Sequence, residues 1–274
     1  SLLILIALSV IGAASGEIVQ NIFAIPTTIG IVGLFVVIGL FTFYGSAVIE
    51  KFMGSWSILL YTCFFLLVVF SFVYFGEDIK TNYKEIVITS GWFTDGVRYA
   101  GYNIATVPAV FFSLKHITKR KEAISSGIIA GIIAIIPAIF LFIAMMGKYP
   151  EINQAAVPST ELLLHIDLPW FSILFQVVLL GTLVQTGVGL IHAINERIAA
   201  TLTSKNKKMP KLARPAVAII ILLIALFLAS RFGLIQLIAN GYGILTIGFI
   251  AVFVIPVLTI GMYKIIVQSR ENSN

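Results

Sequence analysis

Charged residues are scarce in this sequence. Only 11% of its 274 residues are charged, whereas 59% are hydrophobic. A water-soluble domain usually carries about 25% charged residues, so this chain lacks the polar surface that would cover a water-facing globule. Apolar runs of about 20 residues recur along the whole chain, and such runs favour transmembrane helices over the short alternating strands of a β-barrel. We therefore predict an all-α membrane protein.

Groups that could perform catalysis are also scarce. The single cysteine, Cys63, cannot form an intrachain disulfide, and it sits inside an apolar run. The three histidines, His116, His165 and His192, lie far apart in the sequence, and no His or Cys has the spacing of metal ligands. No glycine-rich phosphate loop and no plausible Ser–His–acid set is present. The sequence therefore predicts no enzyme, no cofactor and no metal site.

The net charge of +6 reflects membrane topology rather than nucleic-acid binding. Lys and Arg occupy short connections between apolar runs, and the largest groups fall within 115–121 and 197–214. If the runs cross the membrane alternately, most of the 18 basic residues share one side, which the positive-inside rule identifies as cytoplasmic. We therefore expect a multi-pass protein of the cytoplasmic (inner) membrane, with both ends of this chain in the cytoplasm and with lipid, not nucleic acid, as its surroundings.

The apolar runs predict about eight spans in a single transmembrane domain that covers residues 1–274. The predicted spans are 2–23, 30–49, 56–76, 95–114, 123–147, 168–199, 215–230 and 234–263. Residues 158–165, in an outward connection, predict a helix that is too short to span. The chain opens at Ser1 inside an apolar run without an initiator Met, so we expect further residues upstream.

The fourth span contains two residues that weaken a helix. Gly101 costs about 1 kcal/mol relative to Ala in a helix interior, and Pro108 costs about 3 kcal/mol. Together they predict that helical hydrogen bonding fails within 99–106, where a ligand or an ion could satisfy the freed backbone groups. The alternative is a proline kink in which Gly101 is a close-packing contact. The candidate substrate-binding residues of this segment are Tyr99, Gly101, Tyr102, Asn103 and Thr106.

The sixth span has one small, polar face. Thr182 and Thr186 recur at helical spacing, and their hydroxyls either pack against another helix or bind a cation. Gln185 has several hydrogen-bonding positions to satisfy, which makes it a candidate substrate-orienting residue. His192 and Glu196 form an i, i+4 pair near the cytoplasmic end, which we interpret as a solvated pair, with a proton-transfer or gating element as the alternative.

Several motifs resemble the YkvI family of bacterial membrane proteins. They are Tyr102-Asn103-Ile104-Ala105 followed by Pro108, the basic run 119–123 before a glycine-rich span, and the stretches 149–151 and 233–243. The resemblance covers most of the chain from the fourth span onward. Within 233–243, the sequence Asn-Gly-Tyr-Gly at 240–243 predicts either another helix break or a bend that starts the last span late.

The resemblance implies a fold. The YkvI family is placed with the amino acid–polyamine–organocation transporters, which resemble the leucine-transporter fold of two inverted five-helix repeats. Two helices would then be missing before Ser1, with 1–76 the rest of the first repeat and 95–264 the second. The fourth span becomes one of the fold's two broken helices, and the sixth becomes a helix that supplies hydroxyls to an ion in sodium-coupled relatives. The other broken helix is absent from this chain.

The sequence leads to two functional hypotheses. The first is a secondary active transporter of a small amino-acid-like or amine solute, coupled to H⁺ or Na⁺ and working by alternating access. Thr182 and Thr186 would bind the ion, and Gln185 would complete the substrate site. The second is a receptor or scaffold of the same fold that binds a small molecule without moving it, as spore germinant receptors do. A channel is not favoured, because the sequence has no repeated pore motif or ring of charge. Substrate identity and oligomeric state stay open.

Overall fold

The computed structural model describes residues 2–42, 46–85, 88, 90–104, 107, 114, 116–155, 157–210 and 212–271. Every regular element in these ranges is a helix, which confirms the all-α prediction. Among the described residues, five helical segments are long and apolar enough to cross a membrane, namely Leu2–Phe23, Lys51–Lys84, Arg120–Lys148, Pro169–Thr203 and Ala213–Val267. The chain thus has the composition and the helix lengths of an integral membrane protein.

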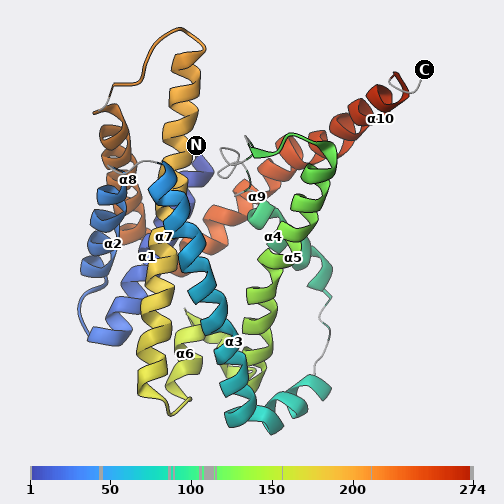
Figure 1. The fold of residues 1–274 in the computed structure, drawn as a ribbon. Helices are drawn as coiled ribbons and strands as arrows, with labels where there is room; N and C mark the ends of the chain where they lie inside the picture. Colours follow the sequence, from blue (N-terminus) through green and yellow to red (C-terminus); the bar gives the residue numbers. More distant parts are fainter. Residues whose placement is uncertain are drawn as a thin grey trace.

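The α-helices follow one another in the order labelled in Figure 1. They are α1 (Leu2–Phe23), α2 (Thr27–Phe41), α3 (Ser46–Lys84), α4 (Trp92–Ile104), α5 (Arg120–Met145), α6 (Pro158–Leu164), α7 (Pro169–Thr203), α8 (Ala213–Gln236), α9 (Gly243–Phe249) and α10 (Met262–Glu271). Two 3₁₀ turns, η2 (Met146–Lys148) and η3 (Glu151–Gln154), precede α6. Three π-helical turns, η4 (Leu237–Tyr242), η5 (Ile250–Val254) and η6 (Val257–Gly261), interrupt the helical segment 237–271, which we call the last long helix.

The second predicted span is shorter than expected. Helix α2 ends at Phe41, because the hydroxyl and the backbone N–H of Thr42 both donate to the carbonyl oxygen of Gly39, at 2.6 and 3.1 Å. The residues from Ser46 onward already belong to α3. At 15 residues, α2 is below the length of about 20 residues that a perpendicular span requires. The predicted short helix after Pro158 is confirmed as α6.

The segments rich in Lys and Arg lie at one end of the bundle. The start of α5, the connection from α7 to α8 and the end of α10 are all at the top of Figure 1. The α1–α2 turn, the segment after α3, and α6 lie at the opposite end. The alternation that we inferred from basic residues is therefore compatible with the course of the chain.

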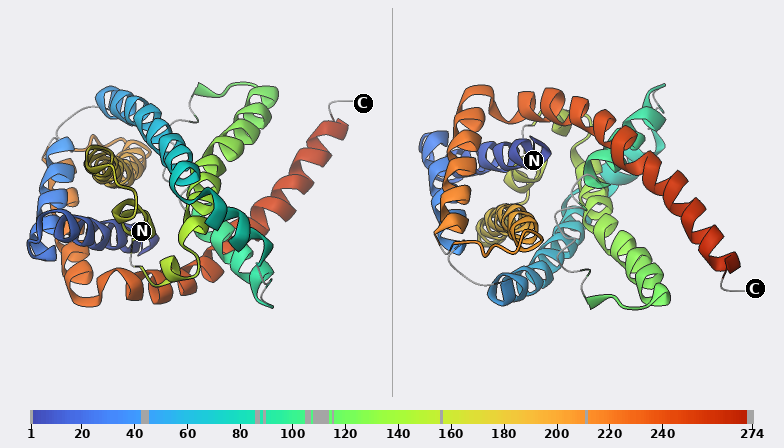
Figure 2. Two further views of the ribbon diagram at one scale, coloured as in Figure 1. Left: turned by 90° about the horizontal axis from the view of Figure 1, so that it is seen from below. Right: turned by 90° about the horizontal axis from the view of Figure 1, so that it is seen from above.

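Two hydrophobic cores meet along α7. The first joins α1, α2, α7 and α8, and it includes the buried residues Leu8, Ile38, Ile191, Ala225 and Leu234. The second joins α3, α6 and α7 around Leu67, Leu162, Phe171 and Phe175. Seen along the bundle in Figure 2, α1, α2, α7 and α8 form a compact group, whereas α3, α5 and α10 cross and diverge on the other side.

The chain turns sharply within α8. Gly233 has φ +69° and ψ 172°, a backbone conformation that a residue with a Cβ rarely adopts. After this turn the chain leaves the group formed by α1, α2, α7 and α8 and runs toward α4, as Figure 2 shows. The sharp turn therefore lies at Gly233, before residues 240–243, where the sequence predicts either a helix break or a bend, and residues 240–242 belong to the π-helical turn η4.

Candidate functional site

Helix α4 runs without interruption through Gly101 to Ile104. The prediction of an open backbone at Gly101 is therefore wrong, and the alternative reading of Gly101 as a packing contact describes it correctly. A Cβ on Gly101 would lie 2.5 Å from Cγ2 of Thr246 and 2.8 Å from Cδ1 of Ile250, so only hydrogen fits between α4 and the last long helix. Asn103 stays within the helix, where its Nδ2 donates to the carbonyl oxygen of Tyr99 at 2.7 Å.

Part of the predicted break falls outside the residues that the structure describes. Thr106 and Pro108 are among these, and so is the side chain of Tyr102. A break after Ile104, caused by Pro108, therefore stays a prediction. Tyr99 is partly exposed on α4.

A pocket opens where α4 packs against α9, next to η4. We call it the α4–η4 pocket. Its volume is about 440 Å³, which is within the range of small-molecule sites. It is lined by Arg98 of α4 and by Ile238, Ala239, Asn240, Tyr242, Gly243, Thr246 and Ile247. The walls are mostly apolar, and a few polar groups converge between them, as in typical ligand pockets.

Four of the residues that line the α4–η4 pocket have polar side chains, namely Arg98, Asn240, Tyr242 and Thr246. Arg98 is the one charged residue among the described residues that line it. A guanidinium nitrogen of Arg98 lies 3.4 Å from Oδ1 of Asp95, one turn earlier on α4. Thr246 is 1% exposed, and within the described part of the chain its Oγ1 has no hydrogen-bond partner. Asn240 contributes an amide from the exposed side of η4.

The π-helical turn η4 shapes the pocket wall. A π-helix closes its hydrogen bonds between residues i and i+5, so it is wider than an α-helix, and such turns occur frequently at functional sites. Gly241 presses against α1, since a Cβ there would lie 2.9 Å from Cγ2 of Ile6. With Gly241 held against α1, its neighbours Asn240 and Tyr242 line the pocket.

The candidate residues of the sixth span lie elsewhere, along a seam between α3 and α7. Nε2 of Gln185 donates to the carbonyl oxygen of Met53 at 2.8 Å and to Oγ of Ser57 at 3.0 Å. Gln185 therefore joins α7 to α3 through both of its amide hydrogens. Because Gly101 packs on α9 and η5 instead, the structure divides the predicted site residues between two places.

Thr182 and Thr186 keep their oxygen lone pairs available. The Thr182 hydroxyl donates to the carbonyl oxygen of Val178, and the Thr186 hydroxyl donates to that of Thr182, both at 2.9 Å. Each hydroxyl oxygen can still accept a hydrogen bond or bind a hard cation. Thr182 is half-buried and Thr186 is exposed. Across the described residues, no group of three His, Cys, Asp or Glu side chains could hold a metal ion.

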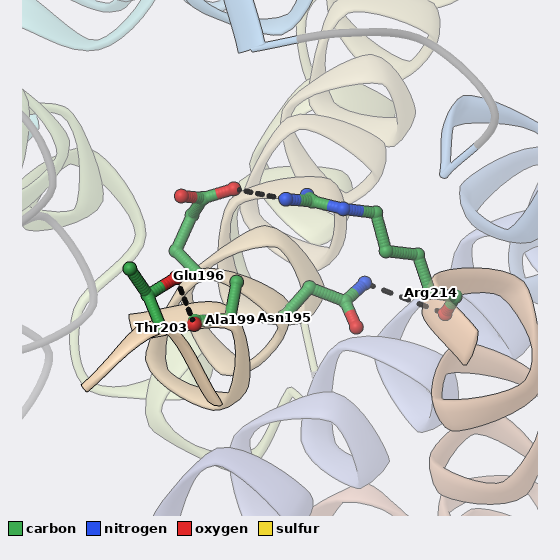
Figure 3. Close-up of polar contacts among 5 residues, drawn as sticks. All are labelled: Asn195, Glu196, Ala199, Thr203 and Arg214. Carbon is green, nitrogen blue, oxygen red and sulfur yellow. Dashed lines mark hydrogen bonds and ion pairs between the residues drawn. The ribbon is translucent and has the colours of Figure 1, made fainter. Parts of the chain in front are cut away.

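A polar cluster joins α7 to α8 at the basic end of the bundle (Figure 3). A guanidinium nitrogen of Arg214 lies 2.8 Å from Oε1 of Glu196, and Nδ2 of Asn195 donates to the carbonyl oxygen of Arg214 at 3.4 Å. His192 is 5% exposed and lines a small cavity that Arg214, Thr42 and Asn195 also line. The interpretation of His192 and Glu196 as a solvated pair is therefore wrong, because Glu196 pairs with α8 and His192 is buried.

The sequence interpretation missed Arg98, Asn240 and Thr246 as site residues. Arg98 lies within the predicted span 95–114, where the sequence predicts a site only at the helix-weakening residues and their neighbours. A charged residue within a predicted transmembrane span is itself a signal of function, and Arg98 lies inside α4, which starts at Trp92. Asn240 lies in the run 240–243, for which the sequence predicts only a helix break or a bend. Thr246 carries no signal in the sequence.

Compared with known proteins, the chain matches no family model, no curated protein and no solved structure. Its function is therefore inferred from its own geometry, and from the α4–η4 pocket above all.

Proposed function

We propose that this chain acts as a secondary active transporter of a small amino-acid-like or amine solute, coupled to H⁺ or Na⁺. The observation that carries the proposal is the α4–η4 pocket, which brings a guanidinium, an amide and a buried, unpartnered hydroxyl together between helices of an apolar bundle. A buried hydroxyl without a partner among the described residues, such as that of Thr246, costs free energy unless a ligand satisfies it. The pocket size suits a solute with the dimensions of an amino acid.

The helix packing supports the proposed leucine-transporter type of architecture. In that arrangement α1 and α2 of the first repeat correspond to α7 and α8 of the second. If α1 corresponds to α7 and α2 to α8, the contact between α1 and α8 in one repeat order should be matched by a contact between α7 and α2 in the other. Both of these contacts are present and extensive. The relation is incomplete, because α1 packs closely on α2 whereas α7 touches α8 at few residues. The YkvI-family membership is part of the same proposal.

The basic end supports the proposed orientation and alternating access. The segments rich in Lys and Arg gather there, and the positive-inside rule would make this end cytoplasmic. The Glu196–Arg214 ion pair and the Asn195 hydrogen bond join α7 to α8 at the same end. Alternating access requires a closure that can open on each side, and this cluster is our candidate for the cytoplasmic closure.

The ion site is proposed on α7. Thr182 and Thr186 would supply hydroxyl oxygens to the coupling cation, and Gln185 would hold α7 against α3 beside them. Tyr99, Gly101, Tyr102, Asn103 and Thr106 remain candidates for the substrate path along and beyond α4. No cofactor and no catalytic residue is part of the proposal.

The decisive experiment is uptake by proteoliposomes that contain the purified protein. Radiolabelled leucine, alanine and putrescine would be offered separately, with an inward Na⁺ gradient, with an inward proton gradient, and with neither. We expect gradient-dependent accumulation of at least one compound above that of protein-free liposomes. Binding without accumulation would favour the receptor or scaffold. Neither binding nor accumulation of any of the three would reject the proposal.

A further inference from the structure

We infer that the solute of the α4–η4 pocket carries a carboxylate and that the Arg98 guanidinium binds it. The inference rests on the proposed function of this pocket and narrows its substrate class from amino-acid-like or amine solutes to carboxylates. Three observations carry it: the charge of the pocket, the hydrogen-bond donors that converge there, and the apolar surface around them.

The charge of the pocket is positive. Arg98 is the only charged side chain that the described lining residues contribute, and arginine stays protonated in proteins. The polar residues that η4 and α9 contribute to the lining are Asn240, Tyr242 and Thr246, none of which is an acidic or basic residue. A protonated amine in this pocket would meet a like charge at Arg98, whereas a carboxylate would meet its counter-charge.

The polar groups of the pocket can all donate hydrogen bonds. A guanidinium carries five N–H donors in a fixed fork, and Arg98 uses one of its terminal nitrogens in a single 3.4 Å contact with Asp95. The Thr246 hydroxyl is buried without a partner in the described structure, and Asn240 adds an amide. A carboxylate has two oxygens that accept such donors together, and paired N–H donation from arginine is among the strongest recognition contacts.

A purely structural role explains Arg98 less well. Its ion pair with Asp95 spans one turn of the same helix, and the two side chains are 59% and 69% exposed. Exposed pairs of this kind contribute little to stability, and this one contributes nothing to the packing of α4 on α9. Asp95 instead occupies part of the guanidinium at long range, where an incoming carboxylate could displace it.

The apolar walls favour an organic carboxylate over inorganic phosphate. Ile238, Ala239 and Ile247 present aliphatic surface, and Tyr242 adds a ring. A phosphate ion would leave these walls in contact with water. The aliphatic chain of an amino acid or a small fatty acid would cover them, and its carboxylate could still reach Arg98.

The test compares four organic probes of similar shape and one inorganic anion. Leucine and 4-methylpentanoate carry a carboxylate, leucinamide and 3-methylbutylamine do not, and inorganic phosphate lacks the aliphatic body. Binding to the full chain in detergent would be measured by thermal shift and by equilibrium dialysis. The variants are Arg98→Gln, Arg98→Lys and Asp95→Asn, and Arg197→Gln is the matched control, because it removes an exposed arginine of α7 outside the pocket.

We expect the two carboxylates to bind the unaltered chain. Arg98→Gln should weaken them about 10- to 100-fold, the usual effect of losing a charged hydrogen-bond partner. Arg98→Lys should retain part of the affinity, and Asp95→Asn should leave it unchanged or increase it. Arg197→Gln should bind like the unaltered chain. Tighter binding of the amines, tighter binding of phosphate, binding of none of the probes, or unchanged carboxylate affinity in Arg98→Gln would each overturn the inference.

The inference and the proposed transport function can fail separately. Carboxylate binding that depends on Arg98, without gradient-driven accumulation in proteoliposomes, would support the carboxylate site and reject transport. Gradient-driven accumulation of putrescine but not of leucine would support transport and reject the carboxylate site.

Discussion

The indole N–H of Trp56 on α3 donates a 3.0 Å hydrogen bond to the carbonyl oxygen of Val178 on α7. The same carbonyl accepts the Thr182 hydroxyl at 2.9 Å, so one backbone oxygen of α7 is shared between its own helix and α3. Gly181 lies directly beneath the indole ring, where a Cβ would overlap ring atoms. A residue without a side chain at 181 is therefore what allows Trp56 to reach Val178.

Gly181→Leu should displace Trp56 and destabilise the α3–α7 seam. Inserting a side chain into a packed interface typically costs about 1–3 kcal/mol, and here the Trp56 hydrogen bond would be lost as well. The measurement is the thermal midpoint of the purified protein, followed by size-exclusion chromatography. The matched control is Gly127→Leu on α5, where a Cβ meets no atom within 4 Å. Equal midpoints for the two variants would show that the close contact at Gly181 does not stabilise the seam.

Thr182→Val should raise the Na⁺ concentration needed for half-maximal uptake, about tenfold, if the coupling ion is Na⁺. Valine keeps the shape of threonine but removes the oxygen that would bind the ion, and losing one polar partner corresponds to about 1–3 kcal/mol. Thr186→Val should act in the same direction. Thr201→Val is the control, because the Thr201 hydroxyl also donates to a carbonyl of α7, that of Arg197, at 2.9 Å. Similar ion dependence in all three variants would remove both threonines from the ion site.

The topology prediction can be tested with two cysteines. Cys63 is buried and would be replaced by alanine, and Ser204→Cys or Gln154→Cys would then be introduced separately at exposed positions. Ser204 follows the last residue of α7, and the connection from α7 to α8 is at the basic end; Gln154 ends η3, shortly before α6 at the opposite end. An impermeant thiol reagent should label Gln154→Cys in intact cells and Ser204→Cys only after the membrane is opened. The reverse labelling pattern would show that the chain has the opposite orientation in the membrane.

The sequence predicted the parts of the fold that depend on local pattern. Long apolar runs predicted the helices that became α1, α3, α5, α7 and α8, and the short helix α6 followed from a segment too short to span. Hydropathy indicates the length of an apolar segment, but it does not indicate which other segments pack against it in the folded protein. The pairing of α4 with α9, which creates the pocket, joins segments far apart in the chain and left no trace in the periodicity.

The errors at single residues have the same cause. Gly101 was expected to open the helix because glycine weakens helices locally, but the contact with Thr246 that explains it is tertiary. His192 and Glu196 share one face of α7, and their spacing alone could not reveal that Arg214 of α8 would take Glu196 as its partner. The identity of a residue sets what it can bind, and the packing of helices decides what it meets.

Glu196→Gln should loosen the closure at the basic end more than it lowers stability. The Glu196 and Arg214 side chains are 35% and 36% exposed, so solvent screens the pair and its loss should cost less than about 1 kcal/mol. Thr42 lines the small cavity to which Arg214 and His192 also contribute. In a chain without Cys63, we expect Thr42→Cys to react several times faster with a thiol reagent when Glu196→Gln is also present. Glu77→Gln, which removes the exposed pair with Lys80, is the control. Unchanged reactivity would mean that the ion pair does not restrict access.

Gly101→Leu should separate α4 from the last long helix and abolish binding in the α4–η4 pocket while the protein stays inserted and folded. The leucine side chain would overlap Thr246 and Ile250, which lie on the segment that carries Asn240 to the pocket. Because α4 is continuous through Gly101, this effect arises from steric separation and not from closing an open backbone. Gly96→Leu is the matched control on the same helix, since a Cβ there meets nothing within 4 Å.

Asn103→Ala tests whether the solute is recognised in the α4–η4 pocket alone or also along α4 outside the pocket. Asn103 donates to the Tyr99 carbonyl within α4, and it does not line the α4–η4 pocket. If it nevertheless contacts the solute on its way, binding should weaken by about 1–3 kcal/mol, the usual effect of removing a polar partner. The measurement for Gly101→Leu and for Asn103→Ala is the affinity for leucine, determined by equilibrium dialysis. Loss of binding in Gly101→Leu alone would confine recognition to the pocket, and loss in both would extend it along α4. Normal binding in Gly101→Leu would mean that the α4–η4 pocket is not the binding site, because no solute could occupy it unchanged after α4 has been displaced.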